Sequence, residues 1–227
     1  MASRRFTLYI ALLLFACLLG PAQASWAQAS AAQPAPQRKT STPYTGDLSI
    51  FDSPGRGQRL HINRVMDILS IAPGKTVADI GAGSGWFTVR AAKRVTEAGI
   101  VYAVDINPEA VHHVADRAQR EHLRNVKVVL GTPDDPQLPA NSIDAVLLLK
   151  TYHEVANPIV LLRNLRTSLR PNARVGVIDR SGNGEDHGIQ KKVVLREAEQ
   201  AGYRLLEEHD DMVKADKMDY FLVLQAK

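Results

Sequence analysis

Residues 77–88, V-A-D-I-G-A-G-S-G-W-F-T, decide the fold of this chain. The apolar residues that open this stretch are typical of a strand buried on both faces. Glycine then stands at every second position, as Gly81, Gly83 and Gly85. Because glycine has no Cβ, it adopts positive φ and lets a ligand lie against bare main chain. The helix expected next would point free N–H groups at the same place, so the stretch predicts a nucleotide-binding type of turn.

Two residues of this stretch favour an adenosyl sulfonium compound over a dinucleotide. A dinucleotide fingerprint needs a third glycine where this sequence has Trp86. Asp79 precedes the first glycine by two residues, and its carboxylate would repel a pyrophosphate but bind an ammonium group. At these residues the sequence resembles the class I S-adenosylmethionine-dependent methyltransferases, whose first motif is an acid followed by G-x-G-x-G. The resemblance implies S-adenosyl-L-methionine as cofactor; a glycine-rich turn without a ligand is the alternative.

A second expected strand, residues 100–106, ends in an acid twenty residues after the last glycine of the turn. A carboxylate at the tip of the second strand of a βαβ unit reaches both hydroxyls of a ribose. Asp105 is therefore the predicted ribose ligand, and Ile106 beside it the apolar wall for the adenine. The alternative role for Asp105 is a helix N-cap, but Asn107 suits that role better because Pro108 follows it.

The segment after the third expected strand, residues 131–142, contains three prolines. Prolines forbid a regular helix, so this segment is predicted to be a loop at the carboxyl edge of the sheet. The family resemblance places an acid of this loop against the adenine amino group. We choose Asp134, with Asp135 as the alternative; either carboxylate otherwise only bonds its own turn.

The fourth expected strand, residues 143–149, leads into K-T-Y-H-E at positions 150–154. The resemblance places this strand end opposite the methyl group, so Lys150 is a candidate cofactor contact and Tyr152 and His153 are candidate catalytic residues. Imidazole titrates near neutral pH, which suits His153 as a general base for a hydroxyl or an acidic carbon. Tyr152 would wall the substrate or donate a hydrogen bond. The alternative is that these residues only shape the loop before the next helix.

The polar segment S-G-N-G-E-D-H-G, residues 181–188, predicts a mobile loop that covers a substrate. A metal site is not expected, because the acids and His187 of this loop have no partner ligands at a defined spacing. The adjacent His112 and His113 lie on an expected helix and point about 100° apart, so they do not share an ion.

The order of the expected elements predicts an α/β fold, a doubly wound and mostly parallel seven-stranded sheet with a terminal antiparallel strand. A helix over residues 58–70 is expected to pack over the edge of the site. The last two strands, residues 203–209 and 220–224, are expected to form a hairpin joined by a charged turn without a helix. The resemblance covers the chain from about Gln58 onward.

Residues 1–24 are typical of a secretory signal peptide. A basic start with Arg4 and Arg5 precedes an apolar run over residues 8–19, which is shorter than the about twenty residues of a bilayer-spanning helix. Cleavage at the end of this segment predicts export, to the periplasm, with only transient membrane contact. The residues before Cys17 loosely resemble a lipobox, so a lipid anchor at that cysteine is the alternative.

Residues 25–47 are rich in Ala, Gln, Pro, Ser and Thr and predict a flexible linker. This leaves residues 48–227 as one domain of ordinary size. The whole chain has 28 basic and 24 acidic residues without a basic cluster, which gives no support for nucleic-acid binding. Its one cysteine lies in the apolar run, so the processed product has no disulfide and no thiol chemistry.

The resemblance implies methyl transfer from S-adenosylmethionine to a small molecule that the sequence does not identify. Two other classes of function stay open. One is a non-catalytic protein that binds an adenosyl cofactor, which export favours because S-adenosylmethionine is made inside the cell. The other is a nucleotide-cofactor oxidoreductase, which Trp86 and Asp79 disfavour.

Overall fold

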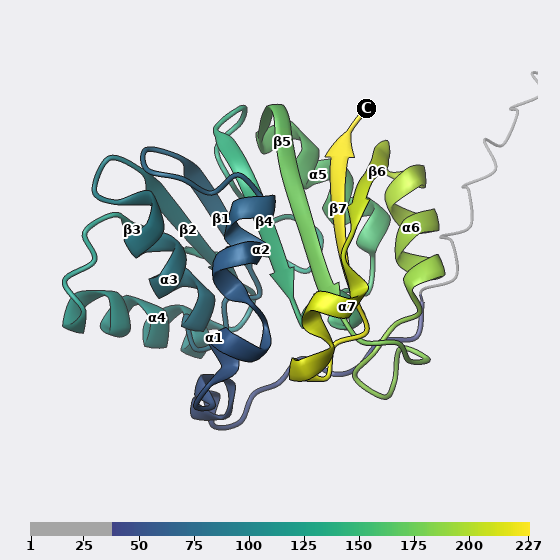
Figure 1. The fold of residues 1–227 in the computed structure, drawn as a ribbon, viewed down its shortest axis with the longest axis horizontal. Helices are drawn as coiled ribbons and strands as arrows, with labels where there is room; N and C mark the ends of the chain where they lie inside the picture. The colour runs from purple at the N-terminus through teal and green to yellow at the C-terminus, as the bar shows by residue number, and fades with distance from the viewer. Residues whose placement is uncertain (1–37) are drawn as a thin grey trace, which may run out of the picture. The chain divides into compact units, whose positions relative to one another are not determined.

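The computed structural model describes residues 38–227, and the expected signal peptide lies outside the described residues. The described residues form one compact unit, in which seven strands make one sheet of order β3-β2-β1-β4-β5-β7-β6 (Figure 1). The strands are β1 Thr76–Ile80, β2 Ile100–Asp105, β3 Val126–Leu130, β4 Ile143–Leu149, β5 Leu169–Asp179, β6 Tyr203–Glu208 and β7 Tyr220–Ala226. β7 pairs antiparallel with both neighbours and the other pairs are parallel. The predicted fold class is therefore confirmed.

Helices cover both faces of this sheet (Figure 1). They are α1 Arg56–Arg59, α2 Ile62–Ile68, α3 Trp86–Val95, α4 Pro108–Arg120, α5 Pro158–Ser168, α6 Lys191–Gln200 and α7 Asp210–Val213, with 3-10 turns η1 Leu48–Asp52, η2 Tyr152–Glu154 and η3 Lys214–Asp216. Alternate residues of β4 show the two layers: Val146 and Leu148 pack with α5 and α6, whereas Ala145 and Leu147 pack with α2 and α3. Burial on both faces explains why β4 is almost wholly apolar.

The strand order reverses between β1 and β4, which are neighbours in the sheet. In open parallel sheets the crevice outside the carboxyl ends of the strands at such a point is where ligands bind. The glycine-rich turn after β1 and the residues after β4 both lie there. The topology alone therefore locates the site.

Two local expectations were wrong. The helix expected over residues 58–70 is two short helices, because His61 between α1 and α2 has φ 47° and interrupts the helical path. The charged segment between the last strands is not helix-free but holds α7 and η3. Its Val213 is fully buried and packs with Met218 against the sheet, so a few apolar residues in a charged stretch fold it back.

The described residues of the predicted linker, 38–47, lie against the domain. The Arg38 guanidinium donates hydrogen bonds to Glu197 and to the main-chain oxygen of Val155, and buried Ser41 donates to the main-chain oxygen of Gly184. These contacts extend the domain to before the predicted boundary at residue 48. No helix among residues 38–227 is both long and apolar enough to cross a membrane.

Candidate active site

A cavity of about 500 Å³ lies at the carboxyl edge, and the glycine-rich turn after β1 forms one of its walls. A Cβ on Gly81, which has φ +75°, would meet the Thr151 side chain at 2.4 Å, so only glycine lets the turn approach the end of β4. At Gly83, with φ +53°, an added Cβ would meet nothing nearer than the Phe51 ring at 3.6 Å. Main chain at Gly83 is therefore open toward the cavity.

The third glycine of the turn has another role than the one predicted for it. Gly85 has φ +74° and is the N-cap of α3, and a Cβ there would meet Val114 of α4 at 3.2 Å. It is not among the residues that line the cavity. Gly85 therefore lets α3 begin sharply and pack close to α4, rather than contacting a cofactor directly.

Asp105 connects the tip of β2 to the glycine-rich turn. Its Oδ2 accepts a hydrogen bond of 2.9 Å from the main-chain N–H of Gly83, and its Oδ1 accepts one of 2.9 Å from that of Asn107. Asp105 and Ile106 both line the cavity, and Ile106 is 42% exposed. This is where a ribose ligand and an adenine wall were expected. Asn107 caps α4, as its side chain accepts from the N–H of Glu109.

Asp79 is buried at the end of β1 and also lines the cavity. Its Oδ2 accepts a 2.6 Å hydrogen bond from the Thr88 hydroxyl, yet burial raises the pKa of this carboxyl to about 7. A buried carboxylate is stable only with a partner. An ammonium group in the cavity would supply that partner.

Two cationic side chains line the same cavity near Asp79. Arg56 is only 7% exposed, stacks its guanidinium over the Trp86 ring and donates to the main-chain oxygen of Phe51. Lys150 has φ 57°, and burial together with nearby arginines lowers its pKa. Lys150 was predicted from the sequence, but Arg56 was missed. The cavity can therefore hold an ammonium and a carboxylate at the same time.

Tyr152 is not at the site, contrary to its prediction as a substrate wall. Its side chain is fully buried in the core, where its hydroxyl donates to Glu197 and the Arg38 guanidinium lies 5.1 Å from its ring centroid. Burial raises the pKa of this phenol well above its ordinary value. The turn η2 directs Tyr152 inward and the next residue toward the cavity.

The structure does not place Asp134 on the cavity either. Thr132 and Pro133 of the same loop line it instead. Asp135, the alternative choice, accepts from the main-chain N–H of Gln137 and so bonds its own turn. The predicted absence of a helix in this loop is confirmed, but neither of its two aspartates is among the residues that line the cavity.

His153 lines the cavity and is held by an acid that the sequence reading missed. Its Nδ1 lies 2.9 Å from Oδ1 of Asp179, and its main-chain N–H donates to Oδ2 of the same carboxylate. Asp179 is fully buried at the end of β5 and also accepts from the N–H of Arg180. Since Asp179 accepts every one of these hydrogen bonds, Nδ1 of His153 carries the proton. Its Nε2 then has a free lone pair, and this atom lies 3.8 Å from Oε1 of Glu154.

The segment before α1 covers the cavity with apolar side chains. Tyr44, Leu48, Ile50 and Phe51 all line it, and the rings of Tyr44 and Phe51 pack edge to face. The cover comes from residues 38–52, not from the helix expected over 58–70.

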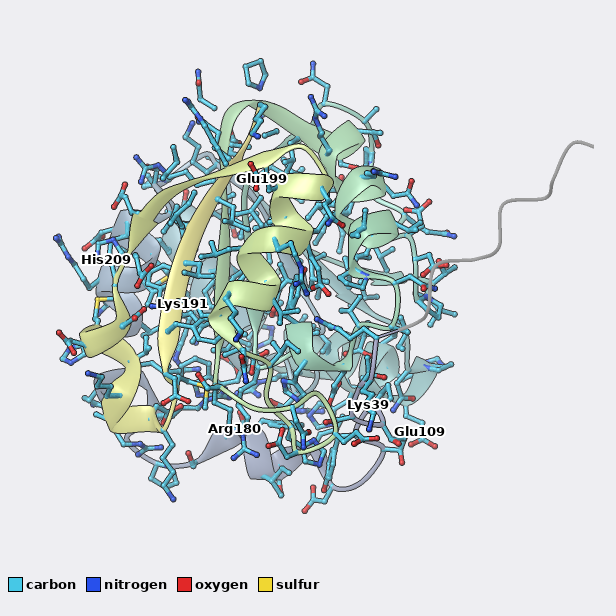
Figure 2. All side chains as sticks on the ribbon, turned by 90° about the vertical axis from the view of Figure 1, so that its right-hand side faces the viewer. Lys39, Glu109, Arg180, Lys191, Glu199 and His209 are labelled. Carbon is cyan, nitrogen blue, oxygen red and sulfur yellow. The ribbon has the colours of Figure 1, made fainter. Side chains whose placement is uncertain are left out.

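Figure 2 shows Lys39, Glu109 and Arg180 together at one end of the molecule, away from Glu199 at the end of α6.

Comparisons with known proteins agree with this fold. Residues 78–177 match the family model described as a methyltransferase domain. A solved S-adenosylmethionine-dependent methyltransferase from Aquifex aeolicus superposes with a TM-score of 0.71 at 24% identity, covering 79% of this chain and 98% of that one. The [4+2]-cyclase SpnF superposes with a TM-score of 0.64 at 16% identity, covering 82% of this chain and 86% of that one. These two solved structures share the fold of this chain.

Two curated proteins that are named as methyltransferases are similar in sequence to part of this chain. Nocamycin O-methyltransferase from Saccharothrix syringae is 35% identical over 115 residues, which are 50% of this chain and 41% of that protein. Aklanonic acid methyltransferase DauC from Streptomyces sp. (strain C5) is 33% identical over 84 residues, 37% of this chain and 38% of that protein. The chain thus spans about two fifths of the length of these relatives.

Proposed function

We propose that this chain binds S-adenosylmethionine and transfers its methyl group to a small-molecule acceptor. The observation that carries the proposal is the hydrogen bond from Gly83 N–H to Asp105, which joins the glycine-rich turn to the tip of β2 at the wall of the cavity. Asp105 retains oxygen lone pairs for ribose hydroxyls, and Ile106 offers an apolar face to an adenine. The SpnF cyclase has the same fold but is named for another reaction, so the site and not the fold alone supports methyl transfer.

The amino-acid part of the cofactor has matching charges in the cavity. The carboxylate of Asp79 is suited to its ammonium group, and the guanidinium of Arg56 and the amine of Lys150 to its carboxylate. Binding would place an ammonium countercharge beside Asp79 in addition to the charge of Arg56, so we expect the proton on Asp79 to leave when the cofactor binds. The site is thereby selective for a zwitterionic adenosyl compound over a pyrophosphate.

When bound, S-adenosylmethionine supplies a methyl group on a sulfonium that is already a good electrophile. The chain's residues then need chiefly to align the acceptor and exclude water. Leu48, Ile50 and Phe51 cover the cavity with apolar groups, which favours a small acceptor with an apolar body. His153, which also lines the cavity, has the Nε2 lone pair free, either to take the proton of the acceptor or to hold a Lewis acid beside it. Two relatives are named for methylating small molecules, nocamycin and aklanonic acid.

The proposal is tested by calorimetry on the full chain with S-adenosylhomocysteine and, separately, with a nicotinamide dinucleotide. We expect one adenosyl ligand to bind per chain and the dinucleotide not to bind. Gly83→Leu should abolish binding because the side chain enters the cavity. Gly74→Leu is the matched control: Gly74 has φ +81° and open space around it, but it is not on the cavity. Dinucleotide binding in place of the adenosyl compound would overturn the proposal.

We also propose that residues 1–24 direct export and that the mature domain works in the periplasm. The basic start and short apolar run of the sequence support this. N-terminal sequencing of the protein recovered from a periplasmic fraction should begin at Ser25. A lipidated Cys17 at the new N-terminus would instead support the anchored alternative, and an unprocessed chain in the cytoplasmic fraction would contradict export.

A further inference from the structure

Three side chains that line the cavity bring their possible metal-ligand atoms close together. His153 and Glu154 come from η2, after β4, and His187 comes from the loop after β5. Each offers a ligand atom, and these atoms lie within 4.8 Å of one another. All three residues line the cavity that also contains the glycine-rich turn. The sequence did not predict this site, because the two segments are more than thirty residues apart.

His153 is already arranged as a metal ligand. Asp179 fixes the proton on Nδ1 through a 2.9 Å hydrogen bond, which leaves the lone pair on Nε2. Metal-binding histidines commonly donate their other ring N–H to a carboxylate in this way, which sets the tautomer and makes the imidazole more basic. The His153 side chain is 2% exposed and cannot swing away from Asp179 without leaving the core.

The side chain of Glu154 has no hydrogen-bond donor among the described residues. Its Oε1 lies 3.8 Å from Nε2 of His153, and its side chain is only 21% exposed. A carboxylate that is mostly withdrawn from water calls for a cation or a donor. Because the His153 tautomer presents a lone pair and not a proton to Glu154, the imidazole does not fill that need.

The loop that carries His187 is held in place by hydrogen bonds. The His187 N–H donates to Ser41 Oγ at 2.8 Å, and its main-chain oxygen accepts from Arg180 Nε at 2.8 Å. His187 has φ 58°, a left-handed conformation that costs a non-glycine residue energy and persists where surroundings impose it. Its ring packs edge to face on the ring of His153, with centroids 5.8 Å apart.

We propose that His153, Glu154 and His187 bind one divalent transition-metal ion, for which zinc is the reference. Two imidazoles and one carboxylate suit zinc and its first-row neighbours better than magnesium or calcium, which prefer oxygen ligands. Tetrahedral zinc with ligand distances of about 2.1 Å places its ligand atoms about 3.4 Å apart. The 3.8 Å between Nε2 of His153 and Oε1 of Glu154 is near that value, and the ligand atom of His187, which lies within 4.8 Å of the other two, has to come closer to reach it.

This inference rests on the proposed function for its chemical role. Three protein ligands leave one position of the ion open toward the cavity, which an acceptor hydroxyl can occupy. The ion makes that hydroxyl more acidic, so its O–H bond breaks and the proton passes to water. The oxygen then forms a bond to the methyl carbon as the carbon–sulfur bond breaks, and the electron pair stays on the sulfur. The acceptor is therefore an oxygen nucleophile, and His153 acts as a ligand and not as a base.

The test measures zinc on the full chain, prepared without a histidine tag and first treated with a chelator. After addition of zinc and gel filtration, elemental analysis should find one zinc per chain. Titration calorimetry should show at least about tenfold weaker binding for Glu154→Gln and for His187→Ala. His187 is on an exposed loop, so its replacement leaves the core intact, and circular dichroism checks the fold of each variant. His112→Ala, an exposed histidine of α4, is the matched control and should bind as the wild type does.

Failure of this inference is distinguishable from failure of the proposed function, because S-adenosylhomocysteine binding is measured on the same samples. No retained zinc in the wild type, or equal zinc affinity in Glu154→Gln, His187→Ala and the control, would overturn the metal site. In that case S-adenosylhomocysteine binding would still support the cofactor site, and His153 would remain the candidate base. Loss of zinc binding in the two variants but not in the control supports the site.

Discussion

Replacing Asp79 by asparagine tests the cofactor site and the stability of the fold together. Burial raises the pKa of this carboxyl from the ordinary 3.8 to about 7. At 1.36 kcal/mol for each pKa unit, that difference corresponds to about 4 kcal/mol of folding free energy lost when the buried group is ionised. Asparagine keeps the shape and an oxygen that accepts from Thr88, but it carries no charge. The variant therefore removes the cost of the buried charge and little else.

The sign of the effect follows from which state binds the proton more tightly. Because the folded chain holds the Asp79 proton up to about pH 7, its free energy of unfolding falls as pH rises from about 4 to about 7 and stays low above that. We expect Asp79→Asn to match the wild type near pH 4 and to be more stable by up to about 4 kcal/mol above pH 8. Denaturant unfolding followed at several pH values measures this difference.

The same variant should bind the cofactor less tightly, although it is more stable. Losing a charged partner for the ammonium group should weaken S-adenosylhomocysteine binding about 10- to 100-fold in calorimetry. Asp105→Asn is the contrasting control: Asp105 accepts from two main-chain N–H groups, so its replacement should lower stability by about 1 kcal/mol instead. If Asp79→Asn were no more stable than the wild type above pH 8, the account of the buried charge would be refuted. Unchanged affinity would refute its role toward the ammonium.

Three further substitutions have definite expected outcomes. Gly83→Leu should cost about 1 kcal/mol of stability for its left-handed conformation yet show no S-adenosylhomocysteine binding in calorimetry. Arg38→Ala should lower the free energy of unfolding by about 3 kcal/mol in denaturant titrations, because it removes the charged partner of the largely buried Glu197 carboxylate and leaves only the Tyr152 hydroxyl as donor. Asp179→Asn should reduce the rate of methyl transfer at least about 100-fold with S-adenosylhomocysteine affinity unchanged, since it frees the ring of His153. Wild-type binding in the first variant, wild-type stability in the second or a wild-type rate in the third would contradict the role given to that residue.

The parts of the fold that the sequence predicted depend on local rules. The strand before Gly81, the turn itself and the acid at the tip of β2 all follow from hydrophobic pattern, φ preference and spacing, and the structure places Asp79 and Asp105 at one cavity as expected. The doubly wound, mostly parallel class of the sheet follows from the alternation of expected strands and helices. None of these inferences needs knowledge of which distant segments touch.

The parts that the sequence did not predict depend on contacts between distant segments. Tyr152 and His153 are adjacent, yet one is fixed in the core by Glu197 and the other at the cavity by Asp179. Nothing local distinguishes their directions. One signal was present: Asp179 ends a buried strand, just as Asp79 and Asp105 lie at or next to the ends of theirs. In the same way, composition alone made residues 38–47 a linker, whereas Arg38 and its partners join that segment to the domain.

A crystal structure of the full chain with S-adenosylhomocysteine bound tests the central claim most directly. The account predicts that the ribose hydroxyls bond to Asp105, that the adenine lies on Ile106 and that the ammonium group lies beside Asp79. A cavity closed by the indole of Trp86, or a ligand bound away from the glycine-rich turn, would contradict it.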